Sequence, residues 1–177
     1  MAYPNLLDFA RIPTDVLVAV DWRPYHFAIQ PYHYLIRITH IASMAAFFGG
    51  IVALDLRLLG WRRALPLGPF VEQIVPWLYV TFGIAFISGC ALFFYDPVHV
   101  GSHAYFTPKL ILTALGVLNA TLFRRSGYLA TLTGNAPPAQ SAVVHARFFG
   151  ILSLTLWISV VVCACLNVEA APRVLLR

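Results

Sequence analysis

The sequence predicts an all-α integral membrane protein, an up-down bundle of four transmembrane helices with an amphipathic N-terminal segment on the outer face. Of the 177 residues, 60% are hydrophobic and 11% are charged, whereas soluble domains average roughly 45–50% and about 25%. The apolar residues gather in four segments, each near the ~20 residues that cross a hydrocarbon core. Backbone groups in lipid must be satisfied within their own segment, so these segments should be helices.

The four predicted helices are bounded by charged residues, glycine or proline. They cover residues 32–59, 70–95, 106–123 and 146–166, within a bundle at residues 32–168. Their ends are marked by Gly60-Trp61-Arg62-Arg63, Asp96-Pro97, Arg124-Arg125-Ser126-Gly127 and Asn167. Short connections make consecutive helices antiparallel neighbours, which gives the up-down order.

Residues 1–31 make up the predicted interfacial segment. Apolar and charged residues alternate near its start, at Leu6, Leu7, Asp8, Phe9 and Arg11. An aromatic cluster of the kind found at membrane–water interfaces follows, and it comprises Trp22, Tyr25, Phe27, Tyr32 and Tyr34. We therefore expect one or two short helices on the outer surface, and a C-terminal tail at residues 169–177. Because residues 1–10 hold no Lys or Arg, we expect no cleavable signal peptide.

Positive charge predicts the orientation. The first and third connections, with the adjoining helix ends, carry Arg57, Arg62, Arg63, Arg124, Arg125 and Arg147. Short loops rich in Arg stay on the cytoplasmic side, so we expect both termini on the outer side. The net charge of +5 is too small and too scattered for nucleic-acid binding. The three cysteines, all in apolar stretches, match neither a disulfide framework nor a zinc pattern.

Ionisable residues inside the first predicted helix are the main site candidates, because such groups usually face a bundle interior or a cavity. His33, Arg37, His40 and Met44 are spaced four, three and four residues apart, so they share one face. His40 lies ~9 residues into the helix, or about 13 Å. It could be an axial ligand to a b-type haem or a hydrogen-bond partner of a quinone. Alternatively, it is a buried histidine hydrogen-bonded to a neighbouring helix.

A haem would need a second ligand at similar depth. His145 lies at the opposite end of the bundle, whereas His26, His99 and His103 lie on the same side as His40. We choose His103 as the second metal ligand, because a loop that dips inward would bring it beneath the outer leaflet. Arg37 and Lys109 would neutralise the propionates.

Other polar groups in the helices have structural interpretations. Asn119 should hydrogen-bond across helices, a contact worth on the order of 1 kcal/mol. Glycines such as Gly49, Gly50, Gly83, Gly89 and Gly116 should let helices approach closely. Asp55 and Arg57 resemble an interfacial charge pair at the end of the first helix. Phosphate loops, hydrolase triads, His-Glu-x-x-His and Cys-x-x-Cys-His are absent from the sequence, so we expect no catalysis by the chain alone.

A family resemblance rests on the run His40, Gly49-Gly50 and Asp55-Leu56-Arg57-Leu58-Leu59-Gly60. This run resembles small four-helix bacterial inner-membrane proteins that are grouped as a domain of unknown function. The likeness covers residues 33–160 and continues through Gly83, Ser88-Gly89, Phe93-Phe94, Phe106, Lys109, Asn119, Ser153 and Trp157. The family's Gly-Arg pair late in the fourth helix is missing, since Cys163-Ala164-Cys165 stands there. The resemblance implies four helices in a bacterial inner membrane, where the outer side that positive charge predicts for both termini is the periplasm, and it adds weight to His40 and Lys109.

Three functions are consistent with these features. The first is a membrane subunit of a redox complex that holds haem b or a quinone near the periplasmic leaflet for electron transfer. The second is a cofactor-free assembly subunit that packs against a larger membrane complex or a second copy of itself. The third is a small transporter or copper-handling protein that uses His40, Met44 and Cys90, because Met and Cys favour Cu(I).

Overall fold

The computed structural model describes residues 10–61, 66–134 and 139–168, and within these ranges it contains helices and no strand. Arg62, Arg63 and the predicted tail at residues 169–177 lie outside the described residues. The long helices are α3 (His33–Leu59), α4 (Leu67–Tyr95), α6 (Phe106–Arg125) and α8 (Gln140–Val168). The short ones are α1 (Thr14–Ala19), α2 (Arg23–Ile29), η2 (Gln30–Tyr32), α5 (Pro97–Gly101) and α7 (Tyr128–Thr133).

Four helices among the described residues are long and apolar enough to cross a membrane. These candidate spans are Arg23–Leu59, Leu67–Tyr95, Phe106–Arg125 and Gln140–Asn167. Only 22–28% of the most apolar window of each span is buried inside the protein. Large apolar side chains therefore cover the outside of the helices, and Phe86 and Ile87 of α4 are 61% and 70% exposed. An apolar outer surface of this extent is typical of a chain solvated by lipid.

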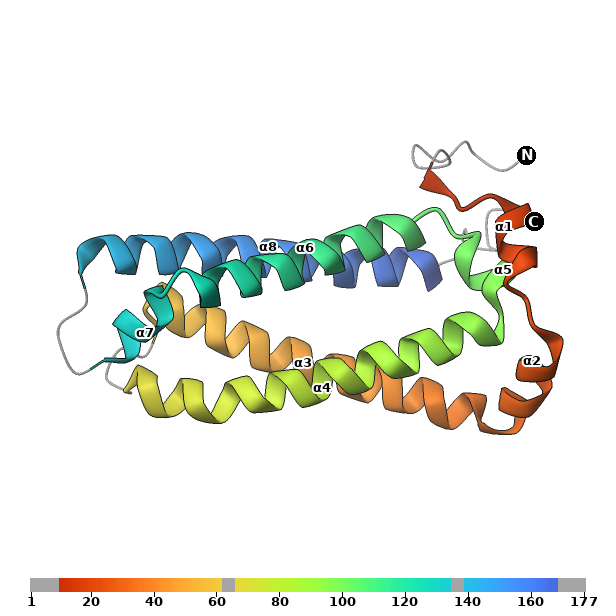
Figure 1. The fold of residues 1–177 in the computed structure, drawn as a ribbon, viewed down its shortest axis with the longest axis horizontal. Helices are drawn as coiled ribbons and strands as arrows, with labels where there is room; N and C mark the ends of the chain where they lie inside the picture. The colour runs from red at the N-terminus through yellow and green to blue at the C-terminus, as the bar shows by residue number, and fades with distance from the viewer. Residues whose placement is uncertain (1–9, 62–65, 135–138, 169–177) are drawn as a thin grey trace, which may run out of the picture.

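The long helices pack in a fixed order of neighbours. α3 packs against α4 and against α8, and α8 packs against α6. Figure 1 shows consecutive long helices running in opposite directions, with α6 and α8 lying over α3 and α4. The core where they meet contains Phe47, Ile51, Leu78, Trp157 and Val160. The edge of the Trp157 indole meets Phe47, with ring centroids 4.7 Å apart.

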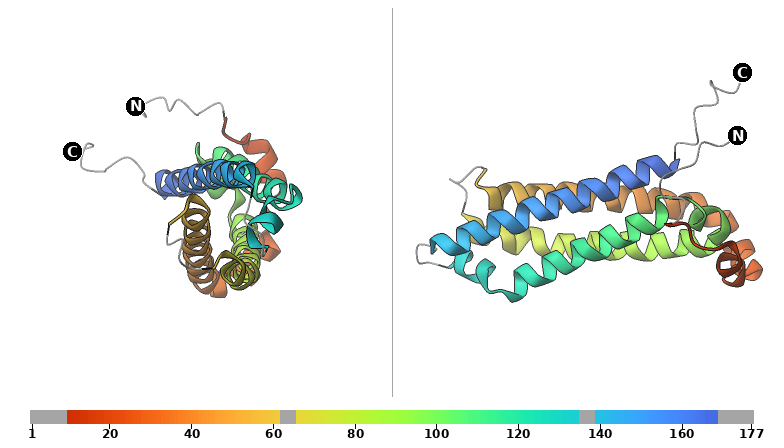
Figure 2. Two further views of the ribbon diagram at one scale, coloured as in Figure 1. Left: turned by 90° about the vertical axis from the view of Figure 1, so that its left-hand side faces the viewer. Right: turned by 90° about the horizontal axis from the view of Figure 1, so that it is seen from above.

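The short helices mark two different ends of the molecule. α1, α2 and α5 lie together at one end, which we call the cap end, and α7 lies at the other (Figures 1 and 2). Arg124 and Arg125 close α6 next to α7, so we call this second end the arginine end. The expected short N-terminal helices are present as α1 and α2.

The cap is held by close packing and ring stacking. Leu17 of α1 is 1% exposed and lies against Gly101 of α5, where an added Cβ would come within 2.4 Å of the leucine. Tyr95, at the end of α4, stacks on both His26 and His33, with ring centroids 4.5 and 5.1 Å apart. His26 Nδ1 also hydrogen-bonds the Tyr95 carbonyl at 2.7 Å. These contacts join α1 to α5, and α2 and α3 to α4.

α8 begins at Gln140 rather than at residue 146, where the apolar run starts. Its first turns are helical because they pack on α7 and α3. Ala142 and Ala146 are 3% and 1% exposed, and His145 stacks on Tyr128 with ring centroids 4.5 Å apart. Tertiary packing therefore extends the helix beyond its apolar part.

Candidate functional site

His40 lies at the contact between α3 and α4. Its Nδ1 is 2.9 Å from the Ala85 carbonyl oxygen and 3.2 Å from Ser88 Oγ. Because a carbonyl can only accept, Nδ1 carries the proton and donates it. Gly89 makes room for the ring, since a Cβ there would lie 3.0 Å from His40 Cε1. The interpretation of His40 as a histidine hydrogen-bonded to a neighbouring helix is therefore confirmed.

The same contact fixes the imidazole tautomer. With the proton on Nδ1, the lone pair is on Nε2, which is the arrangement of histidines that bind a metal and donate Nδ1–H to a carbonyl. His40 thus has one nitrogen suited to ligation. The ligand role of His40 stays a prediction.

The structure sets His103 apart from His40. Ala85, the partner of His40, lies ten residues before the end of α4 at Tyr95, which is about 15 Å along the axis. His103 follows both α4 and α5 and lies beside His99, with ring centroids 5.1 Å apart. Burial, His99 and Arg11 lower the pKa of His103. His103 therefore belongs to the cap end rather than to the depth of His40.

The remaining predicted site residues lie on α3 and α6. Lys109 is partly buried, with its ammonium 5.2 Å from the centroid of the Phe106 ring. Arg37 is exposed and Met44 is partly buried. Across residues 10–61, 66–134 and 139–168, no group of three or more His, Cys, Asp or Glu could hold a metal ion.

A cavity of about 650 Å³, which we call the central cavity, lies nearer the arginine end. It is lined by residues of α3, α4, α6, α7 and α8. These are Phe47, Ile51, Leu54, Asp55, Leu58, Val75, Leu78, Tyr79, Phe82, Val117, Asn119, Ala120, Thr121, Phe123, Arg124, Arg125, Leu129, Phe149, Ser153 and Trp157. Most of the lining is apolar, and its volume is in the range of small-molecule sites.

Exposure of the lining residues shows where the central cavity opens. The exposed members all belong to α4 and α6, and they are Tyr79, Val117, Ala120, Thr121, Arg124 and Arg125. The members from α3 and α8 are buried or partly buried. The cavity therefore has its mouth between α4 and α6 and its floor on α3 and α8.

One pair of side chains bridges the mouth. Arg124 of α6 hydrogen-bonds the hydroxyl of Tyr79 on α4, and its guanidinium lies 5.5 Å from the centroid of the Tyr79 ring. This contact links two helices on either side of the opening. Of the two arginines at the mouth, Arg124 is therefore already engaged with an aromatic partner.

The floor of the central cavity carries polar groups. Asp55 is 3% exposed, Ser153 and Asn119 are each 6% exposed, and Trp157 is 3% exposed. The Ser153 hydroxyl hydrogen-bonds the Asp55 carboxyl, and Asn119 Nδ2 donates to the Phe149 carbonyl at 3.2 Å. The predicted contact of Asn119 across helices is thus confirmed. Asp55 differs from its interpretation as an interfacial residue, because α8 covers it.

Three polar atoms on this floor are buried without a hydrogen-bond partner among the described residues. They are Asp55 Oδ2, Asn119 Oδ1 and Trp157 Nε1. A buried polar atom left unsatisfied costs about 1–3 kcal/mol, and such atoms are rare in native proteins. All three atoms belong to residues that line the central cavity.

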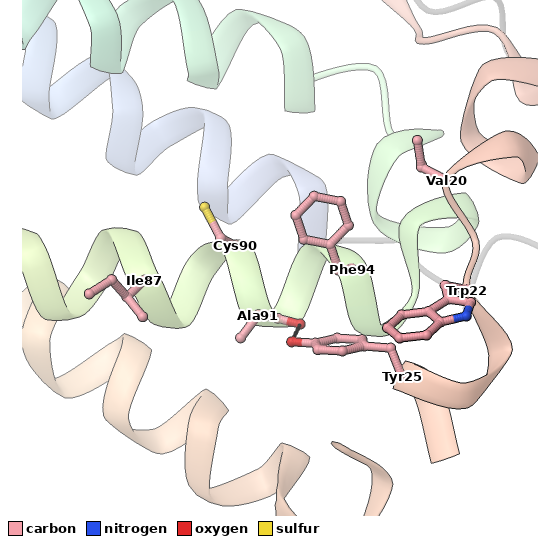
Figure 3. A pocket seen from close by; sticks show the side chains of 7 residues that line it. All are labelled: Val20, Trp22, Tyr25, Ile87, Cys90, Ala91 and Phe94. Carbon is pink, nitrogen blue, oxygen red and sulfur yellow. Dashed lines mark hydrogen bonds between the residues drawn. The ribbon is translucent and has the colours of Figure 1, made fainter. Parts of the chain in front are cut away.

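A smaller cavity of about 360 Å³ lies near the cap end. Figure 3 shows Tyr25 and Trp22 from the α2 region against the last turns of α4, with Phe94 and Cys90 alongside. The Tyr25 hydroxyl donates to the Ala91 carbonyl at 3.3 Å. Cys90 therefore faces an aromatic pocket, while His40 contacts Ala85, Ser88 and Gly89. The structure gives no contact between His40 and Cys90 that would support the copper hypothesis.

These features define a class of helical protein. Its described residues include four helices that are long and apolar enough to span a membrane, and these helices line a cavity that opens between α4 and α6. Compared with known proteins, the chain matches no family model, no curated protein and no solved structure. The family resemblance drawn from the residues of the first helix stays a prediction.

Proposed function

We propose that this chain is an integral protein of the bacterial inner membrane, inserted as an up-down bundle of four helices, that binds a lipid-soluble amphiphile in the central cavity. In this orientation the arginine end faces the cytoplasm and both termini are periplasmic. The positive-inside rule supports the direction, and the apolar outer surface of the helices supports insertion.

The observation that carries this proposal is the shape of the central cavity. Its mouth lies between α4 and α6, on a side that would face acyl chains, and its floor is polar. An amphiphile can enter such a site from the bilayer with its tail against the apolar lining. A quinone belongs to this class, so the cavity offers the quinone of our first hypothesis a site in the opposite half of the bundle.

Trp157 provides a direct test of binding. The chain has four tryptophans, and replacing the other three by Phe leaves Trp157, which is 3% exposed, as the sole emitter. A long-chain alcohol with mid-chain bromines should quench Trp157 in a saturable manner, because only a molecule inside the cavity reaches it. The matched control retains only Trp77, which is 52% exposed and should show unsaturable, collisional quenching.

Filling the cavity supplies the second control. Ala120→Phe places a large ring among the lining residues of α6 and should abolish saturable quenching of Trp157. Ala114→Phe lies on the same helix outside the lining and should leave quenching unchanged. Equal quenching in both variants, or unsaturable quenching of Trp157, would contradict the proposal.

Electron transfer is the second candidate function, and the tautomer of His40 favours it. Nδ1–H donates to Ala85, so Nε2 is available to an iron or to a quinol hydroxyl. A Soret band and a reduced α-band after dithionite, both lost in His40→Ala, would support haem b. A colourless protein would remove haem from this candidate and favour the cofactor-free subunit of a larger complex.

A further inference from the structure

The kind of head group that the central cavity accepts can be derived from its unpartnered atoms. An amide oxygen such as Asn119 Oδ1 only accepts hydrogen bonds, whereas an indole N–H such as that of Trp157 only donates. Asp55 Oδ2 accepts when the carboxyl is ionised. A complementary head group must therefore donate to Asn119 and accept from Trp157.

These three groups lie close together along α8. Asp55 contacts Ser153, and Asn119 contacts Phe149, one turn earlier on the same helix. Trp157 follows Ser153 by four residues, or about 6 Å along the axis. The polar groups thus lie within roughly two turns of α8, about 11 Å, which is more than one hydroxyl reaches, so a small head group needs at least one ordered water to join them.

Gly116 helps to place the indole. A Cβ at this position would lie 2.9 Å from Trp157 Cζ2 and 3.4 Å from Nε1. The indole N–H therefore lies beside the α6 backbone, one helical turn from Asn119. The donor of Trp157 and the acceptor of Asn119 are thus presented along the same pair of helices.

Charge argues against an anionic head on this floor. An anion on this floor would be buried among Asp55, Asn119, Ser153 and Trp157, none of which carries a positive charge, and burying an unpaired charge is unfavourable. An anionic head at the mouth could approach Arg124 and Arg125, but Arg124 is engaged with Tyr79. A lipid whose head group is bound at the mouth would also leave Asp55 Oδ2, Asn119 Oδ1 and Trp157 Nε1 facing its acyl chain.

We infer that the central cavity binds an amphiphile with a neutral hydroxyl head, such as a long-chain alcohol, a phenol or a quinol, between Asp55, Asn119 and Trp157. A hydroxyl is both donor and acceptor, so it matches both kinds of unpartnered atom. The tail extends along the apolar lining toward the mouth at Tyr79 and Arg124. This inference rests on the proposed function, because it assumes that the cavity is a binding site.

The test compares three probes that share one brominated chain and differ in the head, namely an alcohol, its methyl ether and a carboxylate. Each is titrated against the protein whose sole tryptophan is Trp157. The alcohol should half-saturate quenching at a concentration about tenfold lower than the other two, since leaving one buried polar group unpaired typically weakens binding about 5–150-fold. This comparison needs no substitution at the floor.

Variants then assign the preference to residues. Asp55→Leu, the milder Asp55→Asn, and Asn119→Leu should each reduce the preference for the alcohol. Thr155→Val is the matched control, because Thr155 lies outside the cavity lining and its hydroxyl donates to the Ile151 carbonyl of its own helix, and it should keep the preference intact.

The outcomes distinguish the inference of a hydroxyl head group from the proposed binding function of the cavity. Equal binding of alcohol and ether would show a floor satisfied by water and would overturn the hydroxyl inference while the cavity remains a site. Preference for the carboxylate would overturn it in favour of an anionic lipid. Unsaturable quenching by all three probes would instead refute the proposed function itself.

Discussion

The contact between Gly89 and His40 gives a sharp prediction about how α3 and α4 are held together. In Gly89→Ala the new Cβ would lie 3.0 Å from His40 Cε1 and 3.4 Å from Nδ1. Carbon atoms prefer about 3.5–4.0 Å, so the ring must retreat by about 0.5 Å or more. The 2.9 Å bond from Nδ1 to Ala85 then stretches to about 3.4 Å or beyond, outside the range of a good hydrogen bond.

The expected magnitude follows from two opposing effects. Loss of the hydrogen bond from a buried donor costs about 1–3 kcal/mol, while Ala in a helix stabilises by about 0.5–1 kcal/mol relative to Gly. Gly89→Ala should therefore lower the free energy of unfolding by about 0.5–2 kcal/mol. Gly83→Ala on the same helix meets nothing within 4 Å and should raise it by about 0.5–1 kcal/mol.

The assay is reversible unfolding in mixed micelles with increasing SDS, followed by circular dichroism. A double-mutant cycle isolates the contact, because removing the ring in His40→Ala should make Gly89→Ala as mild as Gly83→Ala. The reasoning is refuted if the two glycine variants are equally stable in the native background, or if the cycle shows no coupling.

Three further predictions concern the cavity floor and the cap. Asp55→Leu should change the free energy of unfolding of the ligand-free protein by no more than about 1 kcal/mol, because an apolar replacement of a buried carboxyl is often neutral or stabilising, while it reduces the alcohol preference. A loss of several kcal/mol would mark Asp55 as structural instead. Leu17→Ala should weaken the docking of α1 on Gly101 by about 2–5 kcal/mol, measured as faster hydrogen exchange of α1 alone, and unchanged exchange would contradict the packing. His103 has a lowered pKa in the folded cap, so as the pH falls the unfolded cap takes up the proton before the folded cap does. The stability of the cap is therefore highest above pH ~6.5 and declines as the pH falls below that value. His103→Gln should flatten this pH dependence, measured as hydrogen exchange of α1 and α5 at a series of pH values.

The positions of the long helices could be predicted because lipid-length apolar runs and their polar boundaries are local features of the sequence. α3 ends at Leu59, as predicted, and Gly60 follows with a positive φ of 103°, the common way to end a helix. α5 and α7 were not predicted. They are short, and their helical form depends on packing, as Leu17 on Gly101 illustrates for α5.

The candidate site was harder to predict, for a different physical reason. Asp55 lies near the end of α3 and close to Arg57, so the sequence alone favours the membrane interface. Its burial depends on α8, because Gly150 and Ser153 lie against it, and a single sequence does not reveal that pairing. A polar signal was nevertheless present, since Asp55, Asn119 and Ser153 each interrupt an apolar run.

The glycines of the long helices show the same limit, because sequence alone does not tell which of them contacts a neighbouring helix. Gly89 and Gly116 meet a neighbouring helix, as predicted, through His40 and Trp157, whereas Gly49 and Gly83 have nothing within 4 Å. Residue type alone cannot separate these cases, because the distinction depends on which face meets a partner.

The most direct test is a crystal structure of the protein grown in a lipid phase after purification without delipidation. Our account predicts continuous density in the central cavity, with a hydroxyl head within hydrogen-bond distance of Asp55 or Asn119 and a tail leading out between α4 and α6. A cavity collapsed by its own side chains, or one whose floor is occupied by water alone while acyl chains remain outside the helices, would contradict it.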